Sequence, residues 1–120
     1  MDQTKILVVD DDEGICEMMT RFLLNEGYDA RYVLDGYEAI KLSKKERFNL
    51  IFLDIIMPGI SGIDTIEEIK KYLPEIKTII MTGALIDGSL LAELKRKGVA
   101  GCLQKPFDIE RVLEIIKENK

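Results

Sequence analysis

The sequence predicts a doubly wound α/β domain, in which helices cover both faces of one parallel β-sheet. Short apolar, β-branched runs alternate with segments whose apolar residues recur at helical spacing, and five such pairs can be traced along the 120 residues. Strands that alternate with helices pair in parallel through right-handed crossovers, which place helices on both faces. A chain of this length suits one hydrophobic core, so residues 1–120 are expected to form a single domain.

The first strand is expected at Lys5–Val9, an apolar run flanked by polar residues, as in a strand buried on both faces. Beyond Asp10, apolar residues recur at helical spacing: Ile15, Met18, Met19, Phe22 and Leu23. This spacing predicts a helix that begins near Glu13 and ends before Gly27, a residue typical of helix C-termini.

The same alternation repeats four more times. Further strands are expected at Ala30–Val33, Leu50–Leu53, Lys77–Met81 and Gly101–Gln104. Further helices are expected at Gly36–Lys45, Asp64–Lys71, Gly88–Lys97 and Ile109–Asn119. Asp108 is the expected N-cap of the last helix, because an aspartate there can accept a bond from a free backbone N–H.

Charge and hydropathy limit the partners and the compartment. A formal net charge of −5 disfavours autonomous binding to nucleic acid or to an anionic membrane, so protein partners are expected. No apolar run approaches the roughly 20 residues of a membrane span, and the N-terminus does not resemble a signal peptide. We therefore expect a cytoplasmic protein. Cys16 and Cys102 lie far apart in apolar segments, where buried, reduced thiols are expected.

Chemically active side chains follow four of the expected strands. They are Asp10-Asp11-Asp12 after the first, Asp54 after the third, Thr82 after the fourth and Lys105 after the fifth. Ligands of doubly wound sheets bind outside these carboxyl ends. The sequence holds no histidine, which excludes a histidine base, a histidine zinc ligand and a Ser-His-Asp triad.

The aspartates predict a magnesium site. If the first and third strands are neighbours, their backbones lie about 4.8 Å apart, which brings Asp10 or Asp11 against Asp54. Carboxylates this close repel one another unless a hard divalent cation neutralises them. Mg²⁺ suits the site, because it binds a few carboxylates and completes its shell with water and phosphate oxygens.

Simpler roles stay open for several of these residues. Asp11 and Asp12 can serve as helix N-caps, Thr82 as a loop hydroxyl and Lys105 as a surface lysine. Asp54 differs from them, because it interrupts an apolar run where an unpaired charge is costly. A functional role is therefore favoured for Asp54.

Four motifs together resemble the receiver domain of bacterial two-component response regulators. In chain order they are Ile6-Leu7-Val8-Val9-Asp10-Asp11, Leu53-Asp54-Ile55-Ile56-Met57-Pro58-Gly59, Met81-Thr82-Gly83 and Lys105-Pro106-Phe107. Each motif alone is weak, but four in this order with consistent spacing are a specific signal. The match covers nearly the whole chain.

The resemblance implies a flavodoxin-like sheet with strand order 2-1-3-4-5. It implies that Asp54 accepts a phosphoryl group, that Thr82 contacts this group and that Lys105 pairs with it. The implied Mg²⁺ ligands are Asp10, Asp11, Asp54 and the backbone carbonyl of Ile56. By the same resemblance, the Lys105-Pro106 bond is expected to be cis.

The implied phosphodonor is a sensor histidine kinase or a histidine phosphotransfer protein. Output is expected through the fourth helix, fifth strand and fifth helix, either to a downstream protein target or to an effector domain cut from the C-terminus. Receivers usually carry an aromatic residue three positions before the lysine, where this chain has Cys102, whose thiol is too small to sweep a pocket as an aromatic ring does. Ile56 and Ala84 occupy positions that tend to be polar or charged in receivers that lose the phosphoryl group quickly.

Other functions fit part of the pattern. Asp10-Asp11-Asp12 also resembles the Asp-x-Asp start of haloacid-dehalogenase-type phosphatases, with Asp10 as nucleophile and Asp12 as acid, but this leaves the Asp54 motif unexplained. A non-phosphorylated interaction module is a further alternative. A flavin-binding protein of the same architecture is disfavoured, because three aspartates after the first strand repel a cofactor phosphate.

Overall fold

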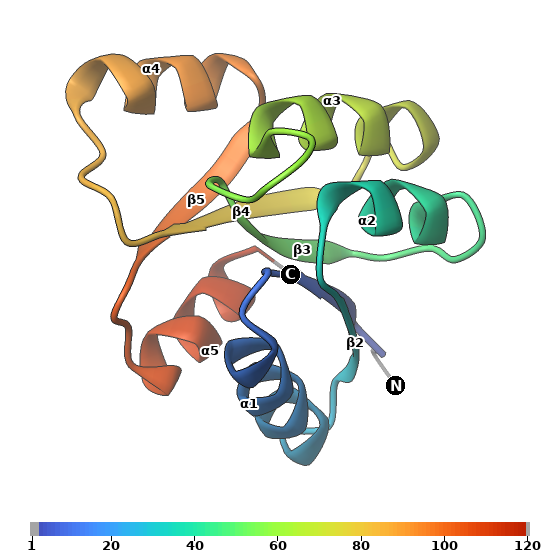
Figure 1. Cartoon of the computed structure of the whole chain (residues 1–120). Coiled ribbons are helices and arrows are strands. Elements are labelled where there is room, and N and C mark those ends of the chain that lie inside the picture. Colours follow the sequence, from blue (N-terminus) through green and yellow to red (C-terminus); the bar gives the residue numbers. More distant parts are fainter. Residues whose placement is uncertain (1–2, 120) are drawn as a thin grey trace.

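A parallel sheet forms the centre of the protein in the computed structural model, which describes residues 3–119 (Figure 1). Its strands are β1 (Lys5–Val9), β2 (Asp29–Val33), β3 (Leu50–Asp54), β4 (Lys77–Thr82) and β5 (Val99–Gln104). They lie in the order β2-β1-β3-β4-β5, with every neighbouring pair parallel. The expected strand order 2-1-3-4-5 is confirmed.

Helices cover both faces of this sheet. They are α1 (Glu13–Asn25), α2 (Gly36–Ser43), α3 (Gly62–Tyr72), α4 (Gly88–Arg96) and α5 (Ile109–Glu118). In Figure 1, α1 and α5 lie below the sheet and the other three helices lie above it. Within residues 3–119, every helix is too short or too polar to cross a bilayer. The doubly wound architecture is thus confirmed.

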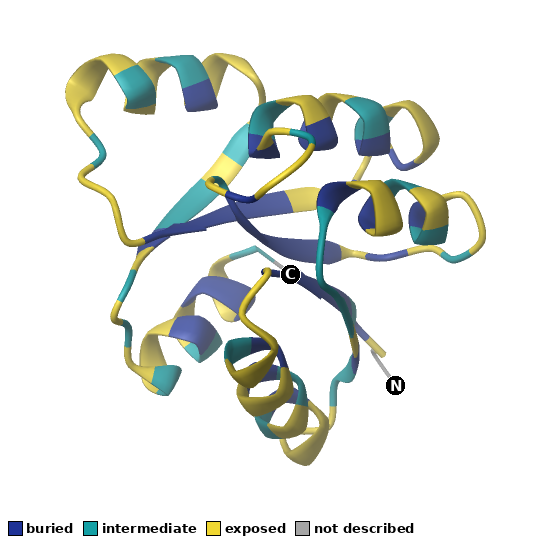
Figure 2. Ribbon diagram, in the orientation of Figure 1, coloured by how far each residue is buried: buried dark blue, intermediate teal, exposed yellow. Residues whose placement is uncertain are grey.

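The central strands are buried because helices cover them from both sides. All residues of β3 are buried, as are Ile6–Val9 of β1, whereas the edge strand β5 is largely half-buried or exposed. Figure 2 shows this gradient along the ribbon. One apolar cluster includes Phe52 and packs against α1 and α5, and the other includes Leu53 and packs against α2, α3 and α4. The two clusters explain why the central strands read as continuous apolar runs.

Side-chain oxygens cap the N-termini of four of the helices. Asp12, Asp35, Ser61 and Asp87 each accept a bond from the backbone N–H three residues later. Asp108 occupies the expected N-cap position of α5, but within the described residues its side chain makes no capping bond. Its backbone carbonyl instead accepts bonds from Arg111 and Val112. The predicted N-cap is therefore correct in position and wrong in its hydrogen bond.

Some boundaries differ from the sequence prediction. Helix α3 begins at Gly62 rather than Asp64, because Ser61 caps it, and α2 ends at Ser43 rather than Lys45. Strand β5 begins at Val99, two residues early, and its pairing with β4 shifts register between Thr78 and Ile79. The spacing of apolar residues in the sequence does not predict these differences in boundary and register, since they depend on backbone pairing.

An ion-pair cluster ties the loop after α2 to the first two strands. Glu46 accepts bonds from Lys5, at 2.7 Å, and from Arg31. The bond from Lys5 is the main reason that the pKa of Glu46 lies below its ordinary value of 4.5; burial opposes this shift and Arg31 adds to it. A carboxylate with a lowered pKa stabilises the fold above its unfolded pKa, and this stabilisation is lost as the pH falls through the folded pKa.

Replacing Glu46 with glutamine should therefore lower the melting temperature at pH 7. The deficit should shrink as the pH falls below about 4.5. Thermal unfolding followed by circular dichroism between pH 7 and pH 3 measures this, with Glu75→Gln, at an exposed glutamate, as control. A deficit that stays constant over this range contradicts the ion-pair explanation.

Candidate functional site

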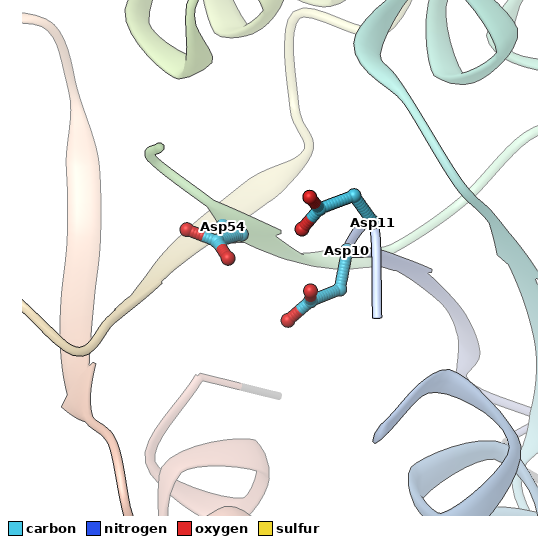
Figure 3. Close-up of side chains that lie close together, drawn as sticks. All are labelled: Asp10, Asp11 and Asp54. Atoms are coloured by element: carbon cyan, nitrogen blue, oxygen red, sulfur yellow. The ribbon is translucent and has the colours of Figure 1, made fainter. Parts of the chain in front are cut away.

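Three aspartates converge at the carboxyl end of the sheet (Figure 3). Asp10 and Asp11 follow β1, and Asp54 is the last residue of β3. The pairing of Val9 with Leu53 brings these strand ends side by side. One carboxylate oxygen from each aspartate lies within 4.8 Å of the others, so the expected crowding is present.

Hydrogen bonds hold two of these carboxylates in place. The backbone N–H of Asp12 donates to Asp10 Oδ1 and that of Ile56 donates to Asp54 Oδ1, both at 2.9 Å. Lys105 Nζ donates to Asp10 Oδ2 at 2.7 Å and to Asp54 Oδ2 at 2.9 Å. Asp10 is fully buried, whereas Asp54 keeps 7% of its surface exposed. Asp54 is therefore a fixed carboxylate that still borders the solvent.

Lys105 stays charged in this setting. Burial, the largest influence, lowers the pKa of Lys105, but the bonds to Asp10 and Asp54 outweigh it and hold the pKa above its ordinary value. A charged ammonium between two carboxylates offsets part of their repulsion. The reading of Lys105 as an ordinary surface lysine is wrong, because it joins the strand ends of β1, β3 and β5.

Thr82 ends β4 and is 1% exposed. Its Oγ1 accepts a bond from the backbone N–H of Ala84 at 3.1 Å, so its hydroxyl proton remains available to a further acceptor. Met81, the residue before it, pairs with Asp54 across β3 and β4. The peptide bond between Lys105 and Pro106 is cis, as the resemblance implied.

The structure separates the roles of Asp11 and Asp12. Asp12 caps α1 through the backbone N–H of Ile15, whereas the Asp11 carboxylate belongs to the aspartate cluster and is exposed. A helix-capping role therefore holds for Asp12 and not for Asp11. Asp11 leaves a carboxylate accessible for an incoming cation.

Both cysteines are free thiols. Cys16 is fully buried and donates from Sγ to the Asp10 carbonyl at 3.3 Å. Burial, followed by the charge of Asp10, raises the pKa of Cys16 to about 12. Cys102 is only half-buried, and burial raises its pKa as well. The expectation of a buried thiol is confirmed for Cys16 and is only partly right for Cys102.

The donor set fits Mg²⁺. Carboxylate oxygens are hard ligands, and Mg²⁺ commonly uses one or two of them and keeps several waters. Asp10, Asp11 and Asp54 supply these oxygens. The Ile56 backbone lies against the same site, because its N–H bonds the Asp54 carboxylate.

The chain is similar in sequence to known proteins. The sequence profile of the response regulator receiver domain matches residues 6–117. The chain belongs to the response regulator receiver family. It is 34% identical over 114 residues to sporulation initiation phosphotransferase F of Bacillus subtilis, covering 95% of this chain and 91% of the relative. It is 35% identical over 116 residues to a CpxR homologue of Haemophilus influenzae, a transcriptional regulatory protein, covering 95% of this receiver but 49% of that protein.

Solved receivers have the same fold. Chemotaxis protein CheY4 of Vibrio cholerae superposes with a TM-score of 0.92 at 27% identity, covering 99% of this chain and 100% of that structure. Response regulator TrrA of Thermotoga maritima, solved in complex with Mg²⁺-BeF, superposes with a TM-score of 0.84 at 31% identity, covering 98% and 100%. Membership of this family disfavours the phosphatase and flavin alternatives. The full burial of Asp10 also argues against its use as a nucleophile.

One polar residue at this edge was missed by the sequence analysis. Gln104 is the last residue of β5, and its side-chain Nε2 donates to the carbonyls of Thr82 and Ala84, both at 3.2 Å. A signal was present, since Gln104 directly precedes Lys105 at the end of a strand. Only the structure shows that its side chain turns back toward β4.

Proposed function

We propose that the protein accepts a phosphoryl group on Asp54 from the phosphohistidine of a sensor histidine kinase or a histidine phosphotransfer protein. The observation that carries this proposal is the Asp54 carboxylate, which is buried except for 7% of the residue's surface and is held beside Asp10, Asp11 and Lys105. In the same proposal, phosphorylation changes the surface formed by α4, β5 and α5, where a downstream protein binds. The chain is then a phosphorylated signalling module and not a turnover enzyme.

The chemistry needs no histidine in this chain. An aspartate carboxylate serves directly as the nucleophile in aspartyl phosphate formation. An oxygen of Asp54 bonds to phosphorus while the phosphorus–nitrogen bond of the donor breaks, and its electron pair leaves with the imidazole. In the proposal, Lys105 holds an equatorial phosphoryl oxygen and the Thr82 hydroxyl donates to another.

Asp10, Asp11, Asp54 and the Ile56 carbonyl are the proposed Mg²⁺ ligands. When bound, Mg²⁺ offsets the charge on the phosphoryl oxygens and the repulsion among the carboxylates. Cytoplasmic residence is part of the proposal, because free thiols such as Cys16 and Cys102 suit a reducing compartment. The net charge of −5 disfavours direct binding to nucleic acid.

Acetyl phosphate with MgCl₂ tests the proposal. Intact mass should increase by one phosphoryl group, and mapping should place it on Asp54. EDTA should abolish the reaction, as should Asp54→Asn, which keeps the side-chain shape but removes the nucleophilic carboxylate. Equal labelling of Asp54→Asn, or a phosphoryl group mapped to Asp10, contradicts the assignment.

We also expect the phosphorylated state to be long-lived for this family. Hydrolysis needs a water in line with the phosphorus–oxygen bond, and neither Ile56 nor Ala84 offers a side-chain group to orient it. Ile56 is 65% exposed, and its backbone N–H donates to Asp54 Oδ1. One well-placed hydrogen bond, worth about 1.4 kcal/mol, changes such a rate about tenfold.

Ile56→Asn and Ala84→Glu should each therefore speed the decay of phosphorylated Asp54 by about tenfold. The loss of phosphoryl mass is followed after the donor is removed. Leu85→Asn is the control, because Leu85 is 93% exposed. Unchanged or slower decay in both test variants shows that these side chains do not set the lifetime.

A further inference from the structure

The connection between β4 and α4 joins the site to the outer surface of the domain. Thr82 lies at its start, and α4 begins at Gly88. The connection has little apolar anchoring of its own: Leu85 is 93% exposed, and a Cβ at Gly83 would have Lys105 Cβ, at 3.9 Å, as its nearest neighbour. Ile86 is half-buried, and polar contacts hold the Thr82–Ala84 turn.

Gln104 supplies two of these contacts. Its Nε2 donates at 3.2 Å to the Thr82 carbonyl and at 3.2 Å to the Ala84 carbonyl. A side-chain amide carries two N–H groups, so one side chain can satisfy both acceptors at once. Within residues 3–119, the Ala84 carbonyl accepts its hydrogen bond from the Gln104 side chain. The Thr82 carbonyl also accepts the backbone N–H of Lys105 at 2.8 Å. The bond to Ala84 is therefore the one that depends on the Gln104 side chain.

Cys102, two residues before Gln104 on β5, lies on the same face of the sheet as Gln104. Residues two apart on a strand point to the same face, so Gln104 shares the α4 side of the sheet with Cys102. Cys102 is half-buried and small, and it offers little packing surface. The side-chain bonds from this face of β5 to the connection are therefore those of Gln104.

The strand order places Gln104 and Asp54 on opposite sides of β4. Strand β4 lies between β3, which carries Asp54, and β5, which carries Gln104. Movement of the Thr82–Ala84 turn toward Asp54 is therefore movement away from Gln104. A bond that exists in only one of two arrangements favours that arrangement.

We propose that Gln104 is a positioning residue that holds the Thr82–Ala84 turn away from Asp54 and so favours the unphosphorylated arrangement of the β4–α4 connection. This rests on the proposed phosphorylation of Asp54. Loss of the two bonds shifts the population toward the arrangement in which Thr82 approaches the phosphoryl group. Phosphorylation should then become faster, although the substituted residue does not touch Asp54.

Gln104→Leu and Gln104→Glu test the inference. Leucine removes the donors at similar size, and glutamate replaces them with acceptors that face two carbonyl oxygens. Both variants should be phosphorylated by acetyl phosphate with MgCl₂ about three- to tenfold faster than the wild type. Without a phosphodonor, their amide resonances for residues 83–88 should move from the wild-type positions toward those of the phosphorylated wild type.

Asn119→Leu is the matched control, because it removes a side-chain amide bond to the Ile115 carbonyl at the far end of α5. It should leave the phosphorylation rate and the resonances of residues 83–88 unchanged. A rate within twofold of wild type for both Gln104 variants, a slower rate, or an equal rise in Asn119→Leu overturns the proposal. If the wild type itself is not phosphorylated, the proposed function fails. The positioning role is tested separately: it is overturned if the resonances of residues 83–88 in the Gln104 variants stay at their wild-type positions.

Discussion

Lys105→Met should lower the rate of Asp54 phosphorylation by acetyl phosphate at least about 100-fold, the usual cost of removing one preorganised group that stabilises charge in a transition state. Lys105 Nζ lies 2.9 Å from Asp54 Oδ2 and its side chain is half-buried, so water screens its charge less than it would at the open surface. Methionine retains a long apolar side chain without the charge. Initial rates measured by intact mass at fixed MgCl₂ give the size of the effect.

The matched control is Lys97→Met, which removes an exposed lysine that pairs with Glu67. It should change the rate less than twofold, because surface ion pairs contribute little and this one is not part of the site. Loss of Lys105 also leaves the buried Asp10 carboxylate without its ammonium partner, so circular dichroism must show that the variant is folded. A folded Lys105→Met protein within threefold of the wild-type rate contradicts a role in charge stabilisation.

The sequence predicted most of the fold for a physical reason. Strands buried on both faces must be apolar along their whole length, and helices on a sheet must carry one apolar face. Asp54 could be predicted as a functional residue for the same reason, since it interrupts an apolar run that otherwise continues to Met57. An isolated charge in such a run is conspicuous because burial without partners is costly.

Other features depend on contacts that no local pattern reveals. Glu46 meets Lys5 across 41 positions of sequence, so composition alone did not indicate this ion pair. Asp108 has the right type and position for an N-cap, yet its side chain is not used as one. Gln104 reads as an ordinary exposed polar residue until its amide is seen to bond two carbonyls of the neighbouring connection.

Gly62 is a further residue whose importance only the structure shows. A Cβ at Gly62 would lie 2.8 Å from Ile55 Cα, 3.2 Å from the Ile55 carbonyl oxygen and 3.3 Å from the Asp54 carbonyl oxygen. All three atoms belong to the backbone that leaves β3, so rotation of a side chain cannot relieve the contact. The first turn of α3 therefore packs against the chain that positions Asp54 at a distance only glycine permits.

Gly62→Ala should destabilise the fold by about 2–3 kcal/mol, as overpacking against a rigid neighbour does. Urea unfolding followed by circular dichroism measures the free energy of unfolding. Gly88→Ala is the matched control: within the described chain nothing lies within 4 Å of a Cβ at this position in the first turn of α4. It should leave stability unchanged or raise it by roughly 0.4–1 kcal/mol, because alanine restricts the unfolded chain. If Gly62→Ala unfolds at the same urea concentration as the wild type, the backbone after Asp54 yields easily and is not held by this contact.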